Sequence, residues 1–210
     1  MIENEFWNMI SLLELVLAHN KLEEPQSIHN ISYFTEQIYK EVQLNYPKLN
    51  ISDEEIENVS KLATIHDIGK LFTPYEILNK KGKLTKDEMD IIKKHPLNGA
   101  NMELKLPKCG KASKLVQYAY NICLYHHERY DGQGYPKGLI GDEIPLCAQV
   151  VGLADAYDAL ISERPYKRKI NHGEAVRMIV NGECGSFSPK VILSFIIASM
   201  NKTWIEKVSK

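Results

Sequence analysis

Apolar positions recur at helical spacing along most of the chain, and this pattern predicts helices. A first stretch of such positions, within residues 4–18, consists of Phe6, Met9, Ile10, Leu13, Leu15, Val16 and Leu17. The helical pattern resumes over residues 28–45 after a polar break that contains Pro25. No segment alternates apolar and polar residues with a period of two, which a half-buried strand would show. The pattern therefore predicts an all-α protein.

Polar residues at the starts of these patterns predict where helices begin. Three pairs have the spacing of a capping box, in which a side chain at the helix start pairs with an acid three residues on. They are Ser52 with Glu55, Thr85 with Glu88, and Asn171 with Glu174. The helix that follows Thr85 is expected to end near His95, because Pro96 comes next. Gly69 is expected to terminate the helix that begins after Ser52.

These elements predict one bundle-like domain of about eight or nine helices, with a glycine-rich active-site loop. Further helices are expected over residues 111–126, from Pro145 through Asp155, and from Ser188 onward. The domain would span residues 25–210. Residues 1–24 would form an N-terminal helix that either packs on this domain, docks to a partner or makes a homodimer contact.

Composition excludes several classes of protein. The apolar fraction of 44% and the charged fraction of 25% are ordinary for a soluble protein. A net charge of -1 provides no general attraction to nucleic-acid polymers or anionic membranes. No apolar run approaches the roughly 20 residues that span a bilayer, and the acidic N-terminus does not resemble a signal peptide. We therefore expect a cytoplasmic protein. The cysteines, which match no zinc or redox spacing and should be free thiols, are Cys109, Cys123, Cys147 and Cys184.

Histidines and acids stand near predicted helix ends at similar intervals. His66 and His95 are 29 residues apart, His95 and His126 are 31 apart, and His126 and Asp155 are 29 apart. Each interval fits one helix and its return, so side chains from different helices could converge on a metal site. The candidate ligands are His29, His66, Asp67, His95, His126, His127 and Asp155.

These residue types suit a site for two metal ions. Imidazole binds first-row transition metals, and a carboxylate can bridge two of them. Two ions roughly 3.5–4 Å apart clamp a phosphate and lower the pKa of bound water. A nitrogen and oxygen set without thiolate favours two divalent ions, iron or manganese, over a structural zinc. Two alternatives stay open: His95 could cap a helix before Pro96, and His127 could support His126 without binding metal.

Two motifs resemble a known family. They are His-Asp-Ile-Gly-Lys at residues 66–70 and His-His-Glu-Arg-Tyr-Asp-Gly-Gln-Gly-Tyr-Pro at residues 126–136. With residues 94–96, 154–160 and 162–167 in the same order, they resemble the HD-GYP subgroup of the HD-domain metal-dependent phosphohydrolases. The similarity runs over residues 29–195. It implies an all-α fold with two or three metal ions, often iron, and hydrolysis of cyclic dinucleotides, usually cyclic di-GMP.

The resemblance also implies roles for individual residues. One ion would be held by His29, His66, Asp67 and Asp155, and a second by Asp67, His95, His126 and His127. Asp67 would bridge the ions, and Lys70 would contact the scissile phosphate, so both are catalytic candidates. The residues expected to bind substrate are Lys70, Gly134, Tyr135, Pro136, Arg164 and Lys167. Members with three ions carry a glutamate where this chain has Pro25, so two ions are expected.

The leading hypothesis is therefore a cyclic-dinucleotide phosphodiesterase, most directly for cyclic di-GMP, in which a metal-activated hydroxide attacks phosphorus. One alternative is a hydrolase of another nucleotide phosphoester or another cyclic dinucleotide. The other alternative is a regulatory module that binds a cyclic dinucleotide without turnover. An intact set of candidate ligands favours catalysis.

Overall fold

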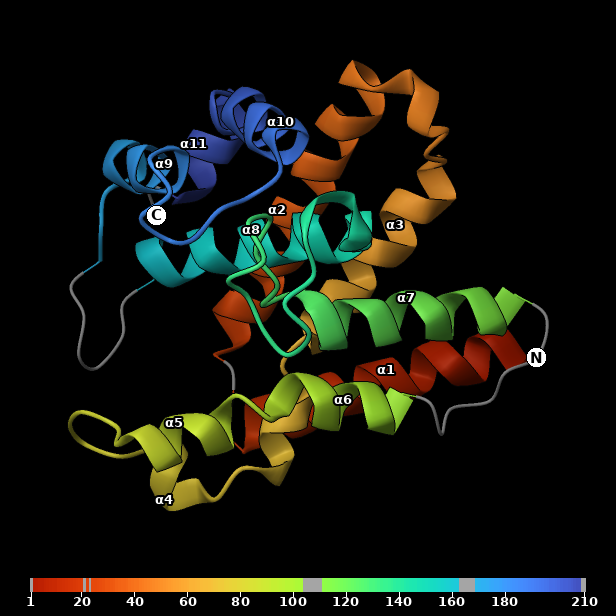
Figure 1. The fold of residues 1–210 in the computed structure, drawn as a ribbon. Helices are drawn as coiled ribbons and strands as arrows, with labels where there is room; N and C mark the ends of the chain where they lie inside the picture. Colours follow the sequence, from red (N-terminus) through yellow and green to blue (C-terminus); the bar gives the residue numbers. More distant parts are fainter. Residues whose placement is uncertain (1, 21, 23, 104–110, 163–168, 209–210) are drawn as a thin grey trace.

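The computed structural model describes residues 2–20, 22, 24–103, 111–162 and 169–208, and all regular structure in them is helical. This confirms the all-α prediction. Figure 1 shows α9, α10 and α11 grouped on one side of the molecule, well away from α4 and α5. The long helices α2 and α8 pack against each other between these groups, and α6 packs beside α7.

The described residues contain eleven α-helices, more than the eight or nine expected, because several short helices carry no periodic apolar pattern. The α-helices are α1 Ile2–His19, α2 Pro25–Asn45, α3 Asp53–Leu62, α4 Tyr75–Leu78, α5 Lys86–Ile92, α6 His95–Glu103, α7 Lys111–Tyr125, α8 Leu146–Ile161, α9 His172–Val180, α10 Pro189–Ser199 and α11 Lys202–Val208. The short 3-10 helices are η1 Pro47–Leu49, η2 Ala63–Ile65, η3 Ile68–Phe72 and η4 Gly141–Glu143.

Side-chain caps begin three helices where the sequence predicts them. Thr85 Oγ1 accepts a hydrogen bond from the backbone N–H of Glu88, whose carboxylate accepts one from the Thr85 N–H, which completes a capping box. Ser52 Oγ accepts from the backbone N–H of Glu55 at the start of α3. The Asn171 side chain begins α9 in the same way. Each such cap stabilises its helix by roughly 1 kcal/mol.

A cluster of aromatic side chains joins the C-terminal helices to the middle of the domain. Phe34 of α2, Tyr157 of α8, Phe195 of α10 and Trp204 of α11 are all fully buried. The Phe34 and Trp204 rings lie 4.6 Å apart, and the indole N–H of Trp204 donates to the Tyr157 hydroxyl over 3.0 Å. Burial of each large apolar side chain contributes about 1.5–3 kcal/mol, so this cluster fixes α8 against its neighbours.

The first helix, α1, packs on its own domain through one apolar face. Phe6, Ile10 and Leu17 on that face are buried, and α1 contacts α7, η2 and η3. Leu12 and Leu15 lie on its exposed face. A docking or dimer role for residues 1–24 stays a prediction. No helix among the described residues is long and apolar enough to cross a membrane.

The structure corrects two sequence expectations near the candidate site. No helix ends at His95; α5 ends at Ile92, and α6 begins at His95. Pro96 is accommodated because it lies in the first turn of α6, where its missing N–H leaves no helical bond unmade. Gly69 does not terminate a helix but lies inside η3, where a Cβ would come within 1.9 Å of the His95 carbonyl oxygen. Its role is to let η3 and α6 approach closely.

One cysteine of the described region can be compared with the prediction: Cys147 is a free thiol, as expected. Burial raises the pKa of the Cys147 thiol to about 12, so this thiol is inert. Cys109 lies outside the described residues.

Candidate metal centre

Four separate elements supply the side chains of the candidate site. His66 and Asp67 lie between η2 and η3, His95 begins α6, and His126 follows the last residue of α7. Asp155 lies on α8. These elements meet because α6 packs against both η3 and α7, and α7 packs against α8 (Figure 1). The convergence of helices expected from the spacing is therefore present.

Asp67 lies at the centre, and its two oxygens face different partners. Oδ1 lies 3.0 Å from Nε2 of His95 and 3.8 Å from Nε2 of His126. Oδ2 lies 3.2 Å from Nε2 of His66, which is also 3.7 Å from Oδ1 of Asp155. Asp67 is only 4% exposed. One buried carboxylate thus stands between two groups of potential ligands.

Backbone contacts determine which nitrogen of each imidazole is a donor. Nδ1 of His66 lies 2.9 Å from the carbonyl oxygen of Ala63. Nδ1 of His95 lies 2.8 Å from the carbonyl oxygen of Ile92. Nδ1 of His126 lies 2.9 Å from the carbonyl oxygen of Ile122. A carbonyl oxygen can only accept, so each Nδ1 carries the hydrogen. In a neutral ring the opposite nitrogen, Nε2, then presents a lone pair.

Three such lone pairs point toward carboxylate oxygens, which are acceptors as well. Nε2 of His66 and Oδ1 of Asp67 are buried without a hydrogen-bond partner. Nε2 of His95 and Nε2 of His126 lie only 3.3 Å apart. Buried acceptors that face one another are unfavourable unless a cation lies between them. Histidines whose Nδ1 is held by a carbonyl are also typical metal ligands. The residues present therefore fit bound metal ions.

The electrostatics of the site keep these donors available. Burial lowers the pKa of His127 to about 3 and that of His126 well below its ordinary value, so both are neutral at physiological pH. Burial alone would raise the pKa of Asp67, but Lys70 and His66 hold it well below the ordinary value. The site therefore combines neutral imidazoles with an ionised carboxylate.

His66 behaves differently because two carboxylates face it. Burial opposes its charged form, but Asp67 and Asp155 together raise the pKa of His66 well above the ordinary value. Burial would raise the pKa of Asp155, but its contact with His66 holds that pKa well below the ordinary value. Without metal, the two carboxylates therefore favour a proton at Nε2 of His66. A metal ion would compete with this proton for the same position.

Close donor atoms gather on one side of Asp67. Asp67, His95, His126 and His127 each offer one ligand atom, and these atoms all lie within 4.8 Å of one another. His66 lies at the other oxygen of Asp67, and Asp155 is reached through its contact with His66. Six of the seven predicted ligands are thus brought together. His29, the seventh, is exposed on α2 and is not one of these close donors.

The start of α2 is nevertheless tied to the helix that carries Asp155. Asp158, one turn after Asp155, accepts hydrogen bonds from Ser27 Oγ over 2.5 Å and from Asn30 Nδ2 over 2.8 Å. These contacts hold the segment around His29 against α8. Asp158 lies in the 154–160 motif, but the sequence assigned it no role, although its position three residues after Asp155 places both acids on one helix face.

Glu128 anchors the glycine-rich loop, and the sequence analysis overlooked this role as well. Its buried carboxylate accepts the backbone N–H of Lys137 over 2.7 Å and that of Leu139 over 3.0 Å. Gly134 lies close against the backbone at the start of this loop, since a Cβ there would lie 2.3 Å from the backbone nitrogen of Arg129. In the sequence, the only signal for Glu128 was its position directly after the His126-His127 pair. The loop is therefore closed on itself.

Arg129 fastens the same loop to the segment before α10. Its guanidinium donates to the carbonyls of His126 over 3.2 Å and Cys184 over 3.3 Å. It also lies 4.9 Å from the centre of the Phe187 ring. Since His126 is a candidate ligand, these contacts help to fix the position of the metal site.

Of the residues predicted to bind substrate, Lys70 and Tyr135 contact the candidate ligands. Lys70 forms an ion pair with Oδ2 of Asp67. The Tyr135 ring stacks on His127, with centroids 4.7 Å apart and an angle of 26° between the planes. Pro136 is exposed beside Tyr135. Arg164 and Lys167 lie outside the described residues.

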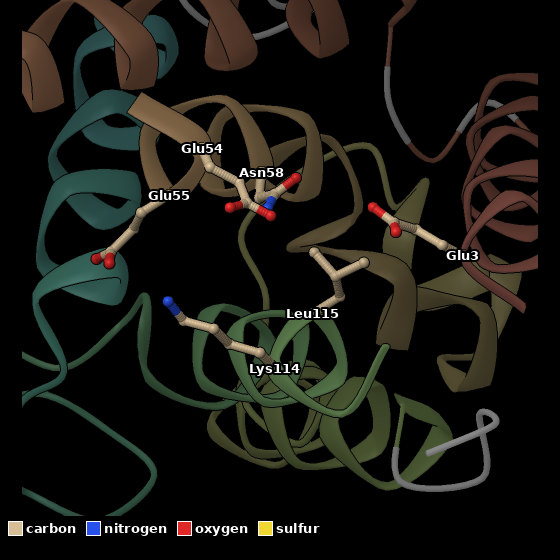
Figure 2. Close-up of a pocket in the computed structure, with 6 residues that line it drawn as sticks. All are labelled: Glu3, Glu54, Glu55, Asn58, Lys114 and Leu115. Carbon is tan, nitrogen blue, oxygen red and sulfur yellow. The ribbon is translucent and has the colours of Figure 1, made fainter. Parts of the chain in front are cut away.

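A pocket of about 150 Å³ lies elsewhere, between α1, α3 and α7. Figure 2 shows its lining: Glu3, Glu54, Glu55, Asn58, Lys114 and Leu115. None of these residues is a candidate metal ligand. The pocket is lined mainly by three carboxylates, one ammonium and one leucine, and it has no imidazole. The candidate chemistry therefore belongs to the metal centre and not to this pocket.

Comparison with known proteins agrees with the geometry. A model of the HD domain family matches residues 18–191. The chain belongs to the HD-domain family. This confirms the family identified from the sequence. The solved structure of an HD-GYP-type protein from Bdellovibrio bacteriovorus, Bd1817, shares the fold of this HD domain, with a TM-score of 0.56 and 24% identity over 79% of this chain and 51% of that one.

Curated relatives of this HD-domain chain include two with a named activity. A probable cyclic di-GMP phosphodiesterase of Vibrio cholerae is 44% identical over 152 residues, which are 72% of this chain and 34% of the relative. A cyclic di-GMP phosphodiesterase of Pseudomonas aeruginosa is 42% identical over 151 residues, which are 72% of this chain and 35% of the relative. The chain thus spans about a third of the length of these relatives.

Proposed function

We propose that this HD domain is a metal-dependent phosphodiesterase that hydrolyses a cyclic dinucleotide, with cyclic di-GMP as the first candidate. The observation that carries the proposal is the buried Asp67 carboxylate, whose two oxygens face the lone pairs of His66 on one side and of His95 and His126 on the other. The names of the two curated relatives support the same substrate class.

The donor set suits two divalent ions, with iron or manganese favoured by nitrogen and oxygen ligands. His66, Asp155 and Oδ2 of Asp67 would hold one ion, with His29 as a further ligand. Oδ1 of Asp67 would hold the second ion, together with His95, His126 and His127. When bound, such a pair supplies a water of lowered pKa and neutralises charge on a phosphate.

The remaining groups of the site prepare it for an anionic substrate. Lys70 is a point charge held at Asp67, beside the position a phosphate would take. Tyr135 covers the outer side of His127 and forms an apolar wall at the rim. Glu128 and Arg129 keep the loop in place through buried hydrogen bonds. These residues bind and orient substrate and exclude bulk water.

The test is anaerobic purification with metal analysis, followed by incubation of the protein with cyclic di-GMP and Fe(II) or Mn(II). Bound metal together with hydrolysis that is lost in Asp67→Ala would support the proposal. Chromatography of the products would separate the linear dinucleotide from mononucleotides. Metal binding without turnover of cyclic di-GMP would direct the assay to other cyclic dinucleotides and phosphoesters. Absence of both metal and turnover would leave a binding module.

A further inference from the structure

Lys93 places a positive charge at the rim of the metal centre. It follows the last residue of α5, is exposed, and comes two residues before His95. Its ammonium lies 5.3 Å from the centre of the Tyr135 ring. That ring stacks on His127. Lys93 thus contacts the site through an aromatic side chain that touches a candidate metal ligand.

The distances limit how far this charge can be from the metal centre. The ammonium is 5.3 Å from the Tyr135 centroid, which is itself 4.7 Å from that of His127, so it lies no farther than about 10 Å from the His127 ring. Backbone hydrogen bonds hold the segment that carries it, since Lys93 N–H donates to the Met89 carbonyl over 2.9 Å. The charge is therefore positioned by the same turn that positions His95.

Two other cations near the centre are committed to protein groups. Lys70 is paired with the Asp67 carboxylate. Arg129 is half-buried and donates to three backbone carbonyls, including those of His126 and Cys184. Lys93, by contrast, is exposed and holds its ammonium over the face of the half-buried Tyr135 ring. A phosphate oxygen would bind this ammonium more strongly than the ring does, because the bond is charge-assisted.

The proposed substrate needs such a charge. A cyclic dinucleotide carries two phosphodiesters in one ring, each with a negative charge. When one lies at the metal ions, the other lies outside their reach and requires its own counter-charge. A lysine has a flexible stem and acts as a point charge, so it can follow this second phosphate.

We propose that Lys93 binds the second phosphodiester of the cyclic dinucleotide and so selects substrates with two phosphates over those with one. This inference rests on the proposed function. It assigns Lys93 to substrate binding and to specificity, and it leaves the phosphate under attack to the metal site and Lys70.

The test compares Lys93→Gln and Lys93→Arg with wild type on cyclic di-GMP and on bis(4-nitrophenyl) phosphate, a diester with a single phosphate, both with Mn(II). Lys94→Gln is the matched control, since Lys94 is the exposed neighbour and loses the same charge at the same helix end. We expect Lys93→Gln to lower kcat/KM for cyclic di-GMP about tenfold, mostly through KM, and to lower that for the single diester less than about threefold. Lys93→Arg should keep most activity on both substrates, and Lys94→Gln should match wild type.

Three results would overturn the inference. Equal losses on both substrates would mean that Lys93 acts by supporting Tyr135 and His127. An equal loss in Lys94→Gln would indicate a general charge effect, and unchanged kinetics in Lys93→Gln would exclude any contact with substrate. Metal content and melting temperature, measured for each variant, identify a loss caused by misfolding. Failure of the wild-type protein to hydrolyse cyclic di-GMP would instead overturn the proposed function, and this inference with it.

Discussion

Oδ1 of Asp67 lies 3.0 Å from Nε2 of His95, although both atoms are acceptors when the histidine is neutral. The Nδ1 hydrogen of His95 is already donated to the Ile92 carbonyl, so no hydrogen of the neutral ring lies between the two atoms. The pair is stable only with a cation between or beside them. This relationship joins the residue before η3 to the first residue of α6 and identifies the cluster as a metal centre.

Asp67→Asn should abolish the metal centre. The substitution keeps the shape but removes the negative charge, and its amide nitrogen cannot bind a metal ion. Loss of an outer-shell partner alone lowers metal affinity or activity about 10–100-fold, so a bridging ligand should cost at least about 100-fold. Elemental analysis and turnover of cyclic di-GMP measure the effect.

Asp142→Asn is the control for that substitution. Its carboxylate is exposed and pairs with Lys190 at the surface over 2.9 Å. Surface ion pairs contribute about 0–1 kcal/mol, so metal content and turnover should match wild type. Retention of both metal ions by Asp67→Asn would contradict the proposed bridge.

Gly69→Ala should disturb the site through packing. The new Cβ would lie 1.9 Å from the His95 carbonyl oxygen and 2.6 Å from the Gly99 nitrogen, both of which are backbone atoms. Such overpacking typically costs about 1–3 kcal/mol, and here it would also push Asp67 away from His95. Urea denaturation should show lower stability, and metal content should fall.

Gly173→Ala is the matched glycine substitution. Gly173 lies in the first turn of α9, and a Cβ there would have its nearest neighbour 3.8 Å away at the Asn171 side chain. Alanine restricts the unfolded chain, so stability should be unchanged or higher by up to about 1 kcal/mol. Equal destabilisation by the two substitutions would refute the close approach at Gly69.

Glu128→Gln should loosen the glycine-rich loop. One of the two carboxylate oxygens that accept from Lys137 and Leu139 would become an amide NH₂, which cannot accept. A buried donor left unsatisfied costs about 1–3 kcal/mol, so we expect lower thermal stability together with reduced kcat.

Glu143→Gln tests the same chemistry at the surface. Its exposed carboxylate accepts a single bond, from the backbone N–H of Ile140 over 2.9 Å, and the glutamine oxygen can replace it. The melting temperature should therefore change little. A loss as large as that of Glu128→Gln would show that burial is not what makes Glu128 important.

The stability of the metal-free protein should fall as pH drops below about 6.5, the ordinary pKa of histidine. Burial lowers the pKa of His127 to about 3 and that of His126 well below the ordinary value. At a pH between these lowered pKa values and about 6.5, the unfolded chain therefore binds protons that the folded chain does not. Each such proton lowers stability by up to about 1.4 kcal/mol per pH unit. His66, whose pKa is raised, acts in the opposite direction: its contribution is present below pH 6.5 and is lost as pH rises through its folded pKa.

Urea titrations of the metal-free protein from pH 7 to 5 measure this slope. His127→Gln should make it shallower, because glutamine binds no proton in either state. His19→Gln, at an exposed position at the end of α1, should leave it unchanged. A slope that is identical in all three proteins would exclude His127 as its source.

Local features of the sequence were sufficient to predict most helices and the family. The capping pairs at Thr85 and Asn171 work through neighbours three residues away, so their effect on the backbone does not depend on the rest of the fold. Motifs such as His66-Asp67 with Lys70 are local as well, and their order along the chain identified the HD domain.

Tertiary structure decided what those residues do together. The sequence places Asp67 near His66, but only the packing of η3 on α6, and of α6 on α7, brings His95 and His126 to its other oxygen. The same packing gave Gly69 its role, which local rules assigned wrongly. These relationships depend on how closely segments far apart in the chain approach one another. Helical periodicity and turn chemistry act over a few residues and carry no information about that distance.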